Sequence, residues 1–104
     1  MPEPANPSLR FAETVRILCD SARRQGLEAP AFRSPCRNPE HTRTLRRRSD
    51  GGVTVAVRMT GRPFAAVQAD LIDSLIVTNP LDPGAAAVVR EELWRALAAA
   101  GQAQ

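Results

Sequence analysis

The stretch RTLRRRSDGGVTVAVRM, residues 43–59, decides the fold expected for this chain. Its first part is rich in arginine, its second part is rich in valine, and Asp50-Gly51-Gly52 separates the two. An Asp-Gly pair between two such runs is a strong signal for a β-hairpin. We therefore expect two antiparallel strands joined by a tight turn.

The length of the turn determines which side of the sheet the arginines face. A two-residue turn at Asp50-Gly51 would place the arginines of the first strand beside the valines of the second, where burial of charge is costly. A three-residue turn at Asp50-Gly51-Gly52, with a glycine in the left-handed region, shifts the pairing by one residue. We adopt the three-residue turn, which predicts Leu45 opposite Val57.

This register gives the hairpin one apolar face and one basic face. The apolar face is expected to contain Leu45, Val53, Val55, Val57 and Met59. The basic face is expected to contain Thr44, Arg46, Arg48, Thr54 and Arg58. Arg43 and Arg47 flank Leu45, where their long aliphatic stems can reach the rim of the sheet.

Helical periodicity predicts three helices around the hairpin. In residues 8–25, apolar side chains recur on one face, Ser8 suits the N-cap and Gly26 suits the C-terminal end. These apolar side chains are Phe11, Val15, Leu18, Cys19 and Ala22.

The other two helices follow the hairpin. Thr60 or Gly61 can cap a helix that has Pro63 in its first turn and ends before Asn79-Pro80. Its last residues, 75–78, are also compatible with a short strand, but we expect helix. A third helix is expected over residues 83–100, because Asp82-Pro83 is typical of a helix start and Gly101 of a helix end.

The order of elements predicts an α+β fold, α-β-β-β-α-α. Residues 30–41 contain three prolines, and Ala31–Ser34 can form an edge strand there. We expect a small three-stranded antiparallel meander with the helices packed on one face, formed by residues 8–101 as a single domain after a flexible arm, residues 1–7. This layout resembles that of small bacterial secretion chaperones.

Charge is distributed unevenly along the chain. All 14 basic residues are arginine, a bias that a GC-rich bacterial genome would produce without selection for binding. Residues 31–62, however, contain eight arginines against two acids, net +6, whereas residues 63–104 carry net −3 and residues 1–30 net 0. Composition bias does not predict this segregation.

Candidate catalytic and metal-binding residues are sparse. Cys19 and Cys36 form no C-x-x-C pair, and Cys36 with the single His41 is too few ligands for a structural zinc site. Asp70 and Asp73 lie on the only polar side of an otherwise apolar helix. Contact with solvent therefore accounts for their presence without a catalytic role. We therefore expect no enzymatic activity, no cofactor and no metal.

Two functional hypotheses follow from the basic face. Its expected binding residues are Arg46, Arg48 and Arg58, with Arg33, Arg37 and Arg62 nearby. The favoured hypothesis is a small non-enzymatic protein-interaction module, adaptor or chaperone-like, which could form a homodimer and which contacts an acidic partner. The alternative is a nucleic-acid-associated protein that binds phosphates through the same arginines.

Two further expectations concern Trp94 and localisation. Trp94 lies at the margin of the third helix, where burial in the core is favoured over a role at an interface. No apolar run is long enough to span a membrane and the N-terminus does not resemble a secretory signal, so a cytoplasmic protein is expected.

Overall fold

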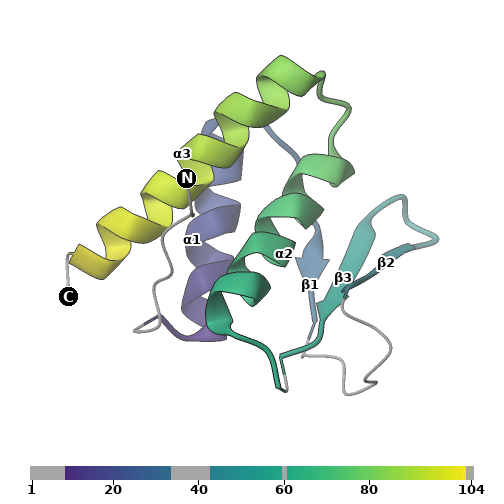
Figure 1. Ribbon diagram of the computed structural model, residues 1–104. Helices are drawn as coiled ribbons and strands as arrows, with labels where there is room; N and C mark the ends of the chain where they lie inside the picture. The colour runs from purple at the N-terminus through teal and green to yellow at the C-terminus, as the bar shows by residue number, and fades with distance from the viewer. Residues whose placement is uncertain (1–8, 34–42, 60, 103–104) are drawn as a thin grey trace.

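The computed structural model describes residues 9–33, 43–59 and 61–102. Its elements, in chain order, are α1 (Phe11–Arg24), β1 (Ala31–Phe32), β2 (Arg43–Arg47), β3 (Val53–Val57), α2 (Phe64–Thr78) and α3 (Pro83–Gln102). The three helices lie together, and the small sheet lies beside α2 (Figure 1). The predicted α+β class is confirmed.

Helix α2 is the centre of the hydrophobic core. It contacts α1, α3 and β3, and its side chains Leu71, Ile72 and Leu75 are fully buried. Full burial of one such side chain contributes roughly 1.5–3 kcal/mol to stability. Because α2 packs against neighbours on more than one side, it is apolar around most of its circumference, as its broad apolar arc in the sequence indicates.

The predicted antiparallel meander is wrong. The strand order is β1-β3-β2, with β2 antiparallel and β1 parallel to β3. This order places the valine-rich strand in the centre, where Val55 and Val57 are buried, and leaves the arginine-rich strand at an edge, where charge stays solvated. Residues 33–42 separate β1 from β2 in the sequence, more than a tight hairpin loop contains, so the two strands need not be neighbours.

The hairpin has the predicted three-residue turn, but the turn lies one residue earlier. The turn residues are 49–51: the Arg48 N–H donates to the Gly52 carbonyl at 2.7 Å, and the Gly51 N–H donates to the Arg48 carbonyl at 3.1 Å. Gly51 takes the left-handed conformation, with φ of 87°. The Asp50 carboxylate supports this turn by accepting the Gly52 N–H at 2.9 Å.

The earlier turn moves the register by two residues. Leu45 therefore pairs with Val55, and the predicted partner Val57 pairs with Arg43. A shift of two leaves every side chain on its predicted face, because side chains alternate with a period of two. Thr44 and Arg46 lie on the face opposite the valines, as expected.

Three predicted helix ends are confirmed. Gly26, with φ of 78°, follows α1, and the Leu27 N–H bonds back to the Ala22 carbonyl at 2.9 Å. Asp82 caps α3 by accepting the Ala85 N–H at 2.7 Å. Residues 75–78 are helical.

Three ends differ from the prediction. Helix α1 begins at Phe11 after Arg10, and the predicted cap Ser8 lies outside the described residues. Pro63, expected within the first turn of α2, is instead its N-cap. Helix α3 continues to Gln102, so Gly101 does not end it. A glycine at a helix end is frequently followed by an apolar residue that contacts the helix, whereas Gly101 is followed by Gln102.

The Asn79 side chain joins the end of α2 to the segment that leads into β1. Its amide group donates to the Leu75 carbonyl at 2.8 Å and to the Glu28 carbonyl at 2.9 Å. Its amide oxygen accepts the Glu28 N–H at 2.9 Å. One side chain thus caps a helix and orients the chain before the sheet.

We expect Asn79→Ala to lower the free energy of unfolding by about 1–2 kcal/mol, because these hydrogen bonds lose their common partner. Urea denaturation measures the change. Glu28→Ala is the matched control, since it removes the side chain but keeps the backbone groups, and it should change stability by less than about 0.5 kcal/mol. Equal effects of the two substitutions would contradict the bridging role of Asn79.

We expect Gly51→Ala to destabilise the chain by about 1–2 kcal/mol, because a Cβ is unfavourable in the left-handed region. Gly52→Ala should cost less, since its φ is not in this region and its added Cβ would meet only the flexible end of Arg48, at 3.0 Å. Thermal unfolding of both variants tests this order. A larger loss for Gly52→Ala would indicate that the turn lies at residues 50–52.

Candidate binding surface on the sheet

The candidate site lies on the outer face of the sheet, defined as the face opposite Val53, Val55 and Val57. The Arg33 N–H donates to the Val55 carbonyl at 2.9 Å, which extends the parallel pairing of β1 by one residue. Arg33 therefore lies beside Ala56, and Thr44 lies on the other side of Ala56. Similarly, Arg46 of β2 lies beside Thr54.

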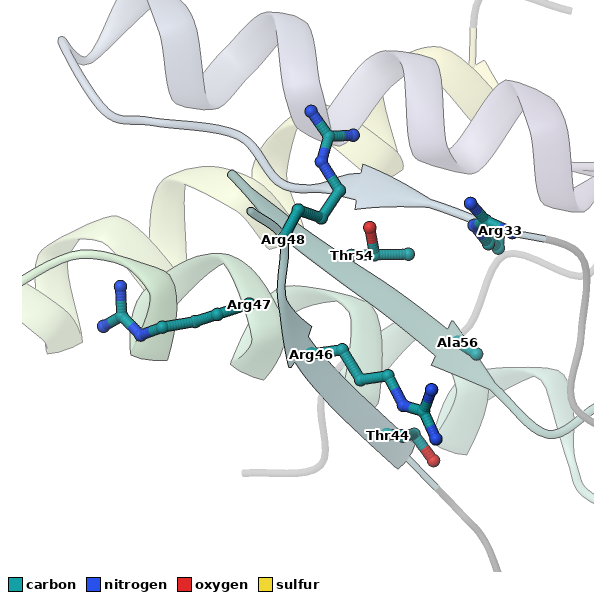
Figure 2. A pocket seen from close by; sticks show the side chains of 7 residues that line it. All are labelled: Arg33, Thr44, Arg46, Arg47, Arg48, Thr54 and Ala56. Carbon is teal, nitrogen blue, oxygen red and sulfur yellow. The ribbon is translucent and has the colours of Figure 1, made fainter. Parts of the chain in front are cut away.

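A shallow cleft of about 450 Å³ follows this face (Figure 2). Its lining residues are Arg33, Thr44, Arg46, Arg47, Arg48, Thr54 and Ala56. The floor consists of the short side chains of the central strand, Thr54 and Ala56, and arginines from both edges of the sheet form its walls. In Figure 2 the Arg46 side chain extends towards Thr44, whereas the Arg47 side chain extends to the other side of β2.

Arg48 lines the cleft but is paired within the turn. Its Nε lies 3.1 Å from Asp50 Oδ1 and its Nη2 lies 2.5 Å from Asp50 Oδ2, a bidentate ion pair. Hydrogen bonds from the Arg48 guanidinium and then from the Gly52 N–H hold the pKa of Asp50 below its ordinary value. The Asp50 carboxylate therefore compensates the charge of Arg48.

Arg58 and Arg62 lie beyond the end of β3 and do not line the cleft. The Arg62 guanidinium is 2.6 Å from the Asp70 carboxylate of α2, and the two side chains are only 15% and 22% exposed. Arg62 also donates to the Arg58 carbonyl at 3.0 Å. This half-buried cluster connects β3 to α2.

Of the six arginines predicted for the site, the structure brings Arg33, Arg46 and Arg48 together at the cleft. Arg37 lies outside the described residues. Within residues 9–33, 43–59 and 61–102, no acidic side chain pairs with Arg33 or Arg46. Thr44 and Thr54 lie on this face as predicted. Ala56 was not named for it, although strand alternation between Thr54 and Arg58 places it there.

The other described candidate residues of the sequence lie in the core or take part in ion pairs. Trp94 is 6% exposed and belongs to the core, in agreement with the favoured interpretation. Asp73 pairs with Arg90 of α3, so the two α2 aspartates serve separate ion pairs. Burial raises the pKa of the Cys19 thiol, which keeps it protonated and unreactive.

Cys36 and His41 lie outside the described residues. Among those described, no three side chains of the metal-binding types gather into a possible metal site. None of the helices in the described part combines the length and apolar composition needed to cross a bilayer.

Comparisons with protein-family models, with curated proteins and with solved structures find no match to this chain.

The Asp50 carboxyl group should titrate below the pKa of an aspartate in a short unstructured peptide. Because the folded-state pKa is lowered, the ion pair stabilises the turn above the unfolded-state pKa, and this contribution is lost as the pH falls through the lowered pKa. NMR titration of the Asp50 carboxyl carbon measures the midpoint. Arg48→Ser should raise it, whereas the matched Arg46→Ser should not; a rise in both variants would contradict the specific pair.

Proposed function

We propose that this chain is a protein-interaction module that binds an acidic segment of a partner protein at the outer face of the sheet. The observation that carries the proposal is the pair Arg33 and Arg46, on opposite edges of the cleft, with which no acidic side chain of the described residues pairs. Two guanidinium groups held by backbone pairing on either side of an uncharged floor favour carboxylates between them.

The width of the cleft suits an extended chain. Arg33 and Arg46 come from the two strands that flank β3, so they are separated by two strand spacings, about 10 Å. Thr54 and Ala56 between them are short and leave room for one extended segment above β3. The Thr44 and Thr54 hydroxyl groups could hydrogen-bond its polar groups.

The same geometry gives weaker support to binding of nucleic acid. Arg48 and Arg62, both predicted phosphate contacts, are paired with Asp50 and Asp70. Contacts of Arg33 and Arg46 alone with two phosphates would give a log–log salt slope of only about −1.8, compared with about −5.4 for all six predicted arginines. Among the described residues that line the cleft, none has an aromatic ring to stack on a base.

Fluorescence anisotropy with a labelled ten-residue glutamate peptide tests the proposal. We expect binding at about 50 mM salt that is stronger than binding to duplex or single-stranded DNA of random sequence. The double variant Arg33→Ser, Arg46→Ser should weaken peptide binding roughly fivefold, since each exposed ion pair contributes about 0.5 kcal/mol.

The matched control is the double variant Arg10→Ser, Arg24→Ser, which removes two exposed charges near the ends of α1. Its net charge equals that of the sheet variant, and its affinity should remain near that of the unaltered chain. Equal losses in the two double variants would show that only net charge matters, and tighter binding to DNA than to the peptide would favour the nucleic-acid function; either outcome contradicts the proposal.

A further inference from the structure

We propose that a second stretch of the acidic partner, adjacent to the segment in the cleft, adds a strand to the free edge of β2, with acidic and apolar side chains in a defined order. This inference rests on the proposed function and specifies how the partner is held. Main-chain hydrogen bonds would supply affinity, and the side chains along β2 would supply specificity.

The outer edge of β2 pairs with no other strand in the described part of the chain. The hydrogen bond from the Arg48 N–H to the Gly52 carbonyl makes these two residues a hydrogen-bonded pair. Hydrogen-bonded and non-hydrogen-bonded pairs alternate in an antiparallel ladder, so Thr44 and Arg46 bond to β3. The backbone groups of Arg43, Leu45 and Arg47 consequently point away from β3 and are available to another strand.

The side chains along this edge define the partner. Leu45 is 38% exposed although it lies next to Val55, which is fully buried. An apolar residue of an added strand, opposite Leu45, would cover it. Arg43 and Arg47 flank Leu45 on the same face and favour acidic residues opposite them, while Arg46 favours an acidic residue on the outer face.

An antiparallel strand that satisfies these positions reads Glu-Glu-Val-Thr-Glu. Its residues lie, in order, opposite Arg47, Arg46, Leu45, Thr44 and Arg43. The threonine would pair with Thr44, a favourable cross-strand combination. We choose the antiparallel direction because its pairing is slightly more stable per residue.

The charges of β2 disfavour a second copy of the chain as the occupant. Antiparallel pairing of two β2 strands about Leu45 would place Arg43 of each copy directly opposite Arg47 of the other. Like charges in such positions destabilise a sheet, and charged edge strands commonly prevent self-association in this way. The same arginines attract a strand that carries carboxylates.

The test uses the full chain and a fluorescein-labelled Glu-Glu-Val-Thr-Glu peptide in anisotropy measurements. We expect it to bind at least fivefold more tightly than the scrambled peptide Glu-Val-Glu-Glu-Thr, which has the same charge. In the proposed pairing the valine N–H points towards β2 and the threonine N–H points away. N-methylation of the valine should therefore weaken binding about tenfold, and N-methylation of the threonine should have little effect.

A substitution in the chain itself tests the same edge of β2. Leu45→Pro removes an N–H that β3 does not use, and proline is tolerated at such edge positions. We expect it to weaken binding about tenfold while the circular dichroism spectrum is retained. Leu45→Ala keeps the N–H and should weaken binding less. The methylated peptides leave the chain unaltered, so they still test strand addition if the Leu45→Pro variant unfolds.

The outcomes separate this inference from the proposed function. Binding that is lost in the Arg33→Ser, Arg46→Ser variant but is insensitive to valine methylation and to Leu45→Pro would overturn strand addition and keep the proposed function. No binding to any acidic peptide would overturn both. A concentration-dependent dimer in light scattering that Leu45→Pro abolishes would identify a second copy as the occupant and overturn the proposal, as would displacement of the peptide by equimolar duplex DNA.

Discussion

The closure of the β2–β3 hairpin by Gly51 is the constraint on which the rest of the structure depends. A left-handed residue at this position ends a three-residue turn, and the hydrogen bond from the Arg48 N–H to the Gly52 carbonyl then determines the pairing of both strands. Every valine of β3 faces α2 as a result, and Arg46 faces away. With the opposite parity the arginines of β2 would lie beside the valines, a cost that a core of this size could not offset.

The position of β3 in the centre of the sheet follows from the same separation of apolar and basic side chains. A central strand loses solvent on both edges and, here, on one face, so the valine-rich strand is suited to it. A short edge strand tolerates charge, and arginines on the edge also oppose unwanted pairing. The arginine-rich β2 and the two-residue β1 are therefore the edges, and the valine face of β3 packs on the apolar circumference of α2.

The uncompensated positive charge of the sheet is smaller than its number of arginines indicates. Arg48 is compensated by Asp50 within the turn, and Arg62 by Asp70 in the middle of α2. These pairs stabilise connections between elements. Arg33 and Arg46 of the outer face, and Arg43 and Arg47 of the free edge, have no acidic partner among the residues that the structure describes. This limited number of guanidinium groups at defined strand positions is the reason for proposing a short acidic segment as the partner, since affinity for a nucleic-acid backbone grows with the number of phosphate contacts.

The sequence by itself determined the three helices, the hairpin and the face of the sheet on which each hairpin side chain lies. Helical periodicity, strand alternation and turn residues are local signals. It also indicated Asp82 and Gly26 at helix ends and the burial of Trp94. Tertiary structure decided the parallel pairing of β1, the arginine pairs with Asp50 and Asp70, and the bridge from Asn79 to Glu28. These depend on residues far apart in the chain or on the exact turn position, where several arrangements satisfy the same local pattern and only packing of the whole chain selects one.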